Sequence, residues 1–340
     1  MEKALVDVAV LLVFFTRYEQ FQKVFEQVRK ARPSELFLYQ DGPRINHADD
    51  IANIRKCREI AEGIDWECKV HRLYQEKNVG VDPSGYIADT WAFSQVEKCI
   101  VLEDDVVPSV SFFSFCKKML DKYENNERVM LISGFNVEEK TEEIETDYFF
   151  SRTTFTWGWA SWSRVVRKWD PKYLFLDKAS EYRKMHQYIN ENHLVKNMLN
   201  VFKEHRDSGV AHFETILISN QYLHEGFTIV PQKNLVNNIG IAADSAHYTS
   251  DLNCVPKGLR RIFTMQRYEI DCSKLIEPNI IEDYPQYRKN SYRIYGWGHL
   301  WVKIYRMFET SFYQIQNGNY RSVVADVKEK MFKFLTRTNS

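Results

Sequence analysis

Three consecutive carboxylates, Glu103, Asp104 and Asp105, are the residues of this chain best suited to chemistry. They follow an apolar run at residues 100–102, which predicts a buried strand. Side chains at the carboxyl end of such a strand lie where open α/β sheets bind ligands. Adjacent carboxylates repel one another unless a positive charge neutralises them. A divalent cation that also holds phosphate oxygens would do so. An acidic, solvated turn is the alternative interpretation.

The segments around this triplet alternate between predicted strands and helices. Apolar runs predict strands over residues 5–15, 35–39, 66–73, 98–102 and 129–135. Apolar residues at helical spacing predict helices over residues 18–30, 49–62, 87–96 and 112–123. Repeated strand–helix–strand units predict an α/β fold with a mostly parallel sheet and helices on both faces.

The pattern loosens after residue 135. An acidic surface loop is predicted at 138–147, helices at about 178–207 and 212–225, and a short strand at 227–230. Aromatic segments punctuated by proline follow residue 255, and a basic helix is predicted near 322–335. The second part of the chain is therefore expected to be less regular than the first.

The charge of the chain is balanced overall but unevenly distributed. It has 46 basic and 46 acidic residues, so nothing indicates a nucleic-acid partner. Residues 287–340 contain ten Lys or Arg and three Asp or Glu, which is a charge of +7 against −7 for the rest. Basic and aromatic residues together suit peripheral contact with an anionic membrane surface. A helical extension that packs on the catalytic domain is the alternative.

The cysteines and the apolar segments bear on localisation. The six cysteines form no C-x-x-C pair and have no zinc-ligand spacing. A reducing, cytoplasmic location is expected, at the inner face of the cell membrane if the basic tail binds lipid. The apolar stretch at 8–15 is too short to cross a bilayer, which takes about 20 residues, and is predicted to be a core strand.

Five short segments, taken in order, resemble the GT-A glycosyltransferases, specifically bacterial sugar transferases related to N-acetylglucosaminyltransferase I. They are residues 15–17 (Phe-Thr-Arg), 39–44 (Tyr-Gln-Asp-Gly-Pro-Arg), 103–105 (Glu-Asp-Asp), 157–162 (Trp-Gly-Trp-Ala-Ser-Trp) and 234–240 (Asn-Leu-Val-Asn-Asn-Ile-Gly). The resemblance implies a GT-A, Rossmann-like catalytic domain over 1–250. Its nucleotide-binding half would be 1–135 and its sugar and acceptor half 136–250, with 251–340 as a helical extension.

The resemblance gives each carboxylate of the triplet a role in binding a nucleotide-sugar donor. Asp105 would hold Mn²⁺ or Mg²⁺ between the two phosphates, where the ion acts as a Lewis acid on the leaving group. Asp104 would accept a hydrogen bond from the ribose. Glu103 would touch the sugar or orient the other two carboxylates.

Three further residues are predicted to bind the nucleotide. Asp41 would accept the uracil N–H, and Arg17 would lie near the base or the diphosphate. Ser84, at a predicted helix start, could offer backbone N–H groups to an anion. The alternatives are an ordinary Asp-Gly-Pro turn at Asp41, a surface position for Arg17 and a simple helix cap at Ser84.

The aromatic segment is predicted to bind the sugar. Trp157 and Trp159 offer flat apolar faces, and Gly158 allows close approach of the backbone. Core packing is the alternative, and it is favoured most for Trp162.

The catalytic base and a second metal ligand are also implied by the resemblance. Glu214 stands where relatives have Trp-Asp, so it would take the proton of the acceptor hydroxyl; an exposed helix residue is the alternative. His247 would ligate the metal or meet the diphosphate, or would be a surface histidine.

These roles imply an enzyme, a hexosyl- or N-acetylhexosaminyltransferase that inverts configuration. It would move a sugar from a nucleotide-sugar, expected to be a UDP-sugar, to a glycan or lipid-linked glycan in surface polysaccharide synthesis. A sugar-phosphate nucleotidylyltransferase would share the fold and the metal. However, no glycine-rich loop with a following Lys or Arg comes after the first strand. A noncatalytic sugar-binding protein is the other alternative, and the intact acidic triplet argues against it.

Overall fold

The computed structural model describes residues 1–189, 191–241, 252 and 255–316. In this part of the chain a central sheet has the strand order β3-β2-β1-β4-β8-β6-β9-β7. The strands are β1 (Val6–Phe14), β2 (Pro33–Gln40), β3 (Lys69–Tyr74), β4 (Lys98–Glu103), β6 (Val129–Ser133), β7 (Tyr148–Ser151), β8 (Trp159–Trp162) and β9 (Phe227–Pro231). A separate pair joins β5 (Val106–Pro108) to β10 (Val236–Asn238).

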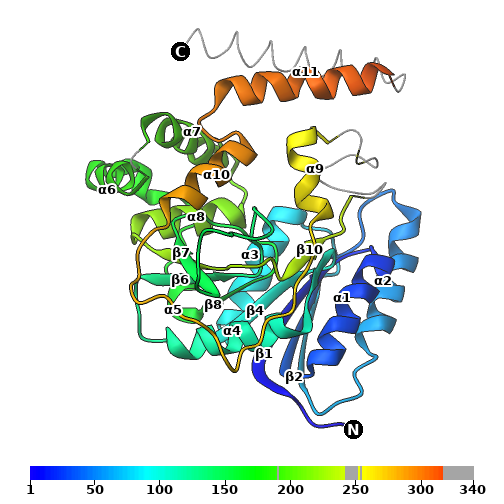
Figure 1. Ribbon diagram of the computed structural model, residues 1–340. Helices are drawn as coiled ribbons and strands as arrows, with labels where there is room; N and C mark the ends of the chain where they lie inside the picture. The colour runs from blue at the N-terminus through cyan, green and yellow to red at the C-terminus, as the bar shows by residue number, and fades with distance from the viewer. Residues whose placement is uncertain (190, 242–251, 253–254, 317–340) are drawn as a thin grey trace.

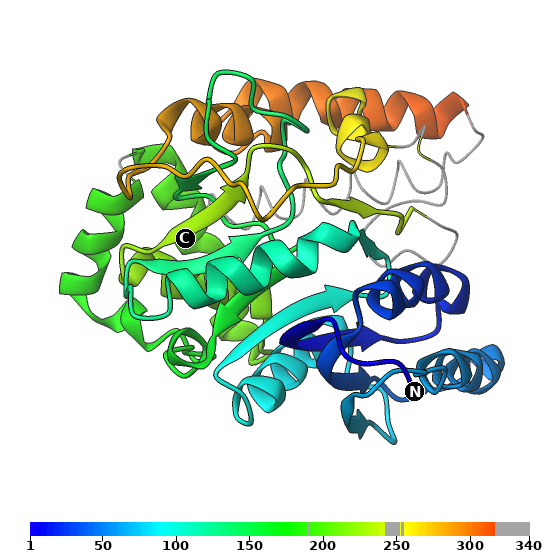
Figure 2. The same ribbon diagram turned by 60° about the horizontal axis from the view of Figure 1, so that its bottom comes forward.

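Helices cover both faces of the sheet, as predicted (Figure 1). The larger ones are α1 (Tyr18–Ala31), α2 (Ala48–Ala61), α3 (Val81–Phe93), α4 (Val110–Lys122), α6 (Ala179–Ile189), α7 (Asn192–Ser208), α8 (Phe213–Leu223), α9 (Lys257–Thr264), α10 (Pro285–Tyr295) and α11 (Leu300–Gln316). The short helices are α5 (Ser163–Val166) and the 3₁₀ helix η1 (Leu174–Asp177). Two hydrophobic cores result. One lies under α1 and α4 and the other under α3 and α6–α8, and α4 crosses its face of the sheet in Figure 2.

The order of the first four strands creates a switch point in the sheet. β1 pairs in parallel with β2 on one side and with β4 on the other. The chain runs outward from β1 through β2 to β3 and then returns to the opposite side of β1 as β4. Ligands of open α/β sheets bind at the carboxyl ends of the strands at such a point. The residues that follow β1 and β4 are therefore the first place to look for a site.

Most of the aromatic segment 157–162 is a strand of the central sheet. Residues Trp159–Trp162 form β8, which lies between β4 and β6 and is antiparallel to both. Side chains alternate along a strand, so Trp159 belongs to one core and Trp162 to the other. Trp162 donates a hydrogen bond from Nε1 to the Leu120 carbonyl at 3.0 Å. Core packing of Trp162 is thereby confirmed.

The remaining predictions of secondary structure hold with shifted boundaries. The strand predicted from 66 begins at Lys69, and the one predicted to 135 ends at Ser133. The helical stretch predicted at 178–207 is divided into α6 and α7. The basic helix predicted near 322–335 lies outside the described residues. In the described part of the chain, no helix combines the length and apolar character that crossing a bilayer requires.

Candidate functional site

Arg17 joins the ends of β1 and β4 at the switch point. It is the residue directly before α1, and its Nη1 lies 2.7 Å from Asp105 Oδ2 and 3.8 Å from Asp104 Oδ1. Its side chain is only 14% exposed, so the ion pair is largely shielded from water. Arg17 is therefore a part of the acidic site and not the surface residue of the alternative interpretation.

Asp104 and Asp105 are buried and held by the backbone around them. Asp104 Oδ2 accepts a hydrogen bond from the Phe15 N–H at 3.1 Å, which ties it to the turn after β1. The Asp105 carbonyl accepts one from the Ile239 N–H at 2.8 Å, and its Oδ1 lies 3.4 Å from Asn238 Nδ2. The two carboxylates thus have set positions, and the segment after β10 lies against Asp105.

Gly240 lies so close to Asp105 that any side chain at this position would require one of the two to move. A Cβ at this position would lie 2.0 Å from Asp105 Oδ2. The Gly240 N–H donates to Asn238 Oδ1 at 2.8 Å, which fixes the turn. The segment 234–240 therefore matters to the site because it encloses the Asp105 carboxylate.

Glu103 lies at the last position of β4, next to several other carboxylates. Burial raises its pKa well above the usual range, and the negative charges of Asp105, Glu214, Asp104 and Asp89 raise that pKa further. Glu214 is thus close enough to the triplet to act on its charge. The charges of acidic residues on α3 and α8 therefore act on Glu103 together with those of Asp104 and Asp105.

Glu214 stands in the first turn of α8 and faces the aromatic segment. Thr156 Oγ1 donates to its Oε1 at 3.3 Å, and the residue is exposed. α8 packs against α3, and the Phe213 ring of α8 lies directly against Gly85 of α3. A Cβ at Gly85 would lie 2.5 Å from Phe213 Cδ1. The structure places Glu214 near enough to the triplet to influence the pKa of Glu103, and its role as catalytic base stays a prediction.

Asp41 organises a loop and does not stand open for a base. Its Oδ1 accepts from the Gly42 and Val79 N–H groups at 2.8 and 2.9 Å. Its Oδ2 accepts from Asn78 Nδ2 at 2.8 Å and the Gly80 N–H at 3.1 Å. These donors use the lone pairs that a uracil N–H would need. The described contacts therefore favour a structural role, in which Asp41 holds the turn before α3.

Ser84 is the fourth residue of α3 and not at the predicted helix start, and it does not cap the helix, which was the alternative. α3 begins at Val81 with Gly80 before it, and the Ser84 N–H already donates to the Gly80 carbonyl at 3.0 Å. That N–H is therefore not available to an anion. Ser84 Oγ instead accepts from the Tyr39 hydroxyl at 3.3 Å, which links α3 to β2.

The aromatic residues predicted to bind sugar separate into two environments. Trp159 is 1% exposed and packs on Phe93 and Trp169, so its faces are not open to a sugar, and that prediction is wrong. Trp157 is half-buried, between the Phe135 and Phe263 rings. Sequence could not separate the two because both flank the same glycine.

Gly158 is needed for the backbone path into β8. Its φ is +58°, and a Cβ there would lie 2.9 Å from Val236 Cγ1. It therefore allows the aromatic segment to approach β10 closely. The described contacts of Gly158 are with the protein, and its predicted contact with sugar stays a prediction.

The predicted metal site is only partly within the described residues. His247 lies outside them. Among the residues that the structure does describe, no group of three or more His, Cys, Asp or Glu side chains could hold a metal ion. A preformed protein cage is therefore not seen in this part of the chain, and Asp105 is the predicted ligand that the structure describes.

Two residues of the site were not found by sequence reasoning. Asn238 contacts Asp105 and accepts a hydrogen bond from the Gly240 N–H. It lies in the 234–240 segment, which the sequence had singled out, but no role had been predicted for it. Asp89 is 1% exposed in α3, and its Oδ1 has no hydrogen-bond partner among the residues that the structure describes. Burial raises its pKa well above the usual range. A single acidic residue in a predicted helix does not indicate from sequence that its carboxylate is buried.

No protein-family model and no curated protein sequence matches this chain. Among the solved structures of other proteins that are similar to part of it are two with low scores. A UDP-glucose pyrophosphorylase complexed with UDP-glucose shares 11% identity, with a TM-score of 0.28 over 48% of this chain and 81% of that one. A protein described as a glucose-1-phosphate thymidylyltransferase, from Bacillus anthracis and in complex with sucrose, shares 9%, with a TM-score of 0.28 over 51% and 75%. Similarity at this level assigns no activity, so the function is argued from the site.

Proposed function

We propose that this protein is a metal-dependent glycosyltransferase that uses a nucleotide-sugar donor, expected to be a UDP-sugar. The observation that carries the proposal is the Arg17–Asp105 ion pair at the switch point between β1 and β4. It brings an arginine and two buried carboxylates to the place where α/β sheets bind nucleotides. A guanidinium suits phosphate oxygens, and a carboxylate suits a hard cation that holds phosphate.

The donor set at Asp105 fits a metal ion that arrives with its substrate. Mn²⁺ and Mg²⁺ at nucleotide sites are commonly held by one or two carboxylates together with phosphate oxygens and water. One protein carboxylate is then enough, which agrees with the absence of a larger ligand cluster among the described residues. A bound ion would supply a Lewis acid at the leaving diphosphate. Asp105 would hold it, and Arg17 would add a second positive charge beside the phosphates.

The acceptor side of the proposed site is formed by α8 and the aromatic segment. Glu214 would take the proton of the acceptor hydroxyl as its oxygen attacks the anomeric carbon. Thr156 would orient that carboxylate through the 3.3 Å hydrogen bond. One base and one leaving-group site suffice for a single displacement, which inverts the anomeric configuration. The proposed acceptor is a glycan or lipid-linked glycan, as in surface polysaccharide synthesis.

The connection after β1 supports sugar transfer over nucleotidyl transfer. β1 ends at Phe14 and α1 begins at Tyr18, so three residues join them, and none is glycine. So short a turn offers few backbone N–H groups to the three phosphates of a nucleoside triphosphate. A diphosphate that is neutralised by a metal ion and Arg17 needs fewer backbone N–H groups.

Release of UDP from UDP-sugars tests this function. The full chain is incubated with a panel of UDP-sugars and Mn²⁺, and we expect UDP release that EDTA abolishes. Asp105→Ala should lose it by about 10²-fold or more, as when an electrostatic contact to the leaving group is removed. Asp65→Ala is the matched control, because Asp65 is an exposed acid paired with Arg29 far from the switch point.

Two results would contradict the proposal. Pyrophosphate release from UTP and a sugar 1-phosphate, without UDP release from any UDP-sugar, would assign a nucleotidylyltransferase instead. Thermal stabilisation by sugars without turnover of any donor would assign a sugar-binding protein.

A further inference from the structure

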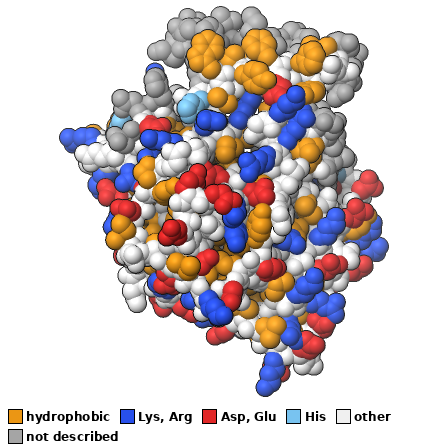
Figure 3. Space-filling view, in the orientation of Figure 1, with side chains coloured by type: hydrophobic (Ala, Val, Ile, Leu, Met, Phe, Trp, Pro, Cys, Tyr) orange, Lys and Arg blue, Asp and Glu red, His pale blue; other side chains and the backbone are white. Residues whose placement is uncertain are grey.

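α11 is an amphipathic helix whose apolar side faces away from the protein. Five side chains form one stripe, because their spacing of three or four residues places them on the same face of a helix. They are exposed by 80% (Trp301), 67% (Tyr305), 66% (Phe308), 58% (Phe312) and 42% (Ile315). Figure 3 shows hydrophobic side chains gathered at the top of the molecule, where Figure 1 places α11.

Two charged residues of α11, Arg306 and Glu309, are turned toward the protein body. Arg306 donates to the Ile294 carbonyl at the end of α10. Glu309 Oε1 accepts from the Lys257 N–H at 3.1 Å, and the Arg260 guanidinium lies over the Tyr313 ring of α11. A surface helix of a water-soluble protein normally has the opposite arrangement, with its apolar stripe inside. An apolar stripe this large on the surface indicates an interaction site.

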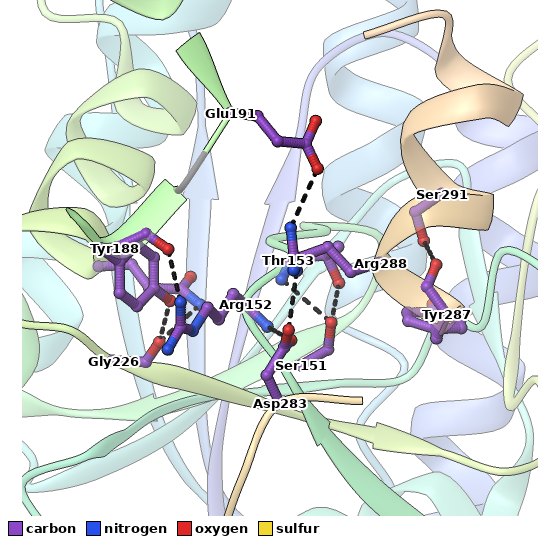
Figure 4. Close-up of polar contacts among 11 residues, drawn as sticks. Ser151, Arg152, Thr153, Tyr188, Glu191, Gly226, Asp283, Tyr287, Arg288 and Ser291 are labelled. Carbon is purple, nitrogen blue, oxygen red and sulfur yellow. Dashed lines mark hydrogen bonds and ion pairs between the residues drawn. The ribbon is translucent and has the colours of Figure 1, made fainter. Parts of the chain in front are cut away.

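The segment that carries α11 is fixed to the sheet. Arg288 in α10 pairs with Asp283 at 2.8 Å and with Glu191 at 3.3 Å, and the Arg152 N–H donates to Asp283 at 3.0 Å (Figure 4). Tyr287 is fully buried against Phe149 of β7. The stripe therefore has a set orientation on the molecule.

The stripe also lies at the same end of the molecule as the candidate site. α11 packs on α9, and Phe263 of α9 packs on Trp157 with 5.2 Å between ring centroids. Figure 1 shows α11 above α9 and α10, opposite the N-terminus. A groove of about 340 Å³ opens between α9 and α11, and Trp301 and Tyr305 line it together with Gly258 and Arg306.

Charge decides which partner the stripe suits. Residues 287–316 contain five Lys or Arg and one Glu, a charge of +4, and residues 317–340 contain five and two, a charge of +3. A second copy of the chain would place two basic faces against each other, and the 317–340 segment is also basic. Anionic phospholipid headgroups attract such a surface, and Trp, Tyr and Phe suit the interface beneath them. α11 itself is not a membrane-spanning helix.

We infer that the exposed apolar face of α11 binds the surface of an anionic lipid bilayer and holds the candidate site next to it. The helix lies in the plane of the interface. Its aromatic stripe enters the headgroup region, and exposed basic residues such as Lys303 and Arg293 meet the lipid phosphates. This binding is independent of the sugar chemistry, because it needs no residue of the candidate site.

Vesicle flotation of the full chain tests the inference. We expect binding to mixed phosphatidylcholine–phosphatidylglycerol vesicles, weakening as salt increases, and much less binding to phosphatidylcholine alone. The variant Trp301→Ser/Phe308→Ser/Phe312→Ser should lose about tenfold or more in partitioning, since each side chain loses buried apolar area. Lys303→Glu should weaken binding to the anionic vesicles only.

A matched control replaces exposed apolar residues elsewhere. Ile51→Ser/Ile280→Ser changes side chains that are 70% and 60% exposed, and it should float like the unmodified protein. Circular dichroism checks that both variants are folded. Equal flotation of the stripe variant and the control, or no flotation of the unmodified protein, would overturn the inference. If the unmodified protein is a dimer and the stripe variant is a monomer, the stripe would instead be the contact with a second copy of the chain.

Discussion

The Arg17 guanidinium lies 2.7 Å from the Asp105 carboxylate across the switch point of the sheet. Residue 17 follows β1 and residue 105 follows β4, so the contact joins two neighbouring parallel strands at their carboxyl ends. Arg17 is positively charged and suits a phosphate group, and Asp105 is negatively charged and suits a cation. The predictions below test this pair, its surroundings and the structure that supports it.

Replacing Arg17 tests its part in donor binding. Arg17→Ala should reduce UDP release by about 10²-fold or more, because the site loses a positive charge beside the phosphates. Arg17→Lys should keep part of the activity, since an ammonium retains the charge but not the planar fork of donors. Steady-state kinetics of UDP release measures both. Arg29→Ala, which breaks an exposed ion pair, is the control, and equal activity of Arg17→Ala and this control would exclude Arg17 from the site.

Gly240→Ala tests the enclosure of Asp105. The added Cβ would lie 2.0 Å from Asp105 Oδ2, so either the carboxylate or the segment after β10 must move. We expect a loss of metal-dependent UDP release and a smaller stabilisation of the protein by UDP with Mn²⁺, measured as a thermal shift. Gly63→Ala, where the nearest atom outside the adjoining residues is 3.1 Å away, is the control. Unchanged thermal shifts in Gly240→Ala would show that Asp105 does not need this contact.

Glu214→Gln separates chemistry from donor binding. The amide keeps the shape of the side chain but cannot act as a base, so turnover should decrease by about 10²–10⁴-fold. Binding of the donor, measured by isothermal calorimetry, should be nearly unchanged. Glu225→Gln, at an exposed position after α8, is the control. Near-normal turnover would remove Glu214 from the catalytic role.

Acid should destabilise the protein through His205. Burial lowers the pKa of His205 below its ordinary value of 6.5, and the stacked His212 ring lowers it further, while Asp82 and Glu204 oppose this. The folded state then binds a proton less readily than the unfolded state. Stability should therefore be lost as the pH falls below about 6.5 and through the lowered pKa.

The pH effect can be assigned with one variant. His205→Asn should flatten the dependence of the melting temperature on pH between about pH 5 and 6.5. His47→Asn, at an exposed position, should leave it as steep as in the unmodified protein. A dependence that stays equally steep in His205→Asn would place the effect on other groups.

Breaking the Arg288 contacts tests how firmly the C-terminal helices are attached. The side chains of Arg288 and Asp283 are 12% and 10% exposed, so Arg288→Met leaves a largely buried carboxylate without its partner. We expect a loss of about 3 kcal/mol in the free energy of unfolding, measured by urea denaturation. Arg206→Met removes a more exposed pair with Asp177 and should cost less than about 1 kcal/mol. Equal effects would show that the Arg288 contacts contribute little.

Much of the fold could be predicted because its signals are local. Apolar runs and helical spacing identified the helices and, apart from the short β5, the strands of the first 135 residues, and the triplet at 103–105 could be placed at the end of β4. The insertion of β8 between β4 and β6 could not be predicted. Strand order depends on pairing between residues far apart in the chain. The sequence of a short aromatic segment does not indicate which strands it pairs with.

The same limit explains the errors at the site. Trp157 and Trp159 look alike in sequence, yet one is half-buried near α9 and the other is in the core. Asp41 was expected to face a ligand, but the loop at 78–80, far along the chain, takes its lone pairs. Side-chain type and spacing show what a residue can do, whereas its partners depend on which segments meet.

The sequence by itself determined the α/β pattern, the acidic residues at a strand end, and the aromatic and basic character of the C-terminal segment. Only the tertiary structure decided that Arg17 contacts Asp104 and Asp105, that Gly240 encloses Asp105, and that α11 turns its aromatic stripe outward. The physical reason is the range of the interactions. Periodicity and turn chemistry act over a few neighbouring residues. Ion pairs, close backbone approach and the side on which a helix packs depend on the whole folded chain.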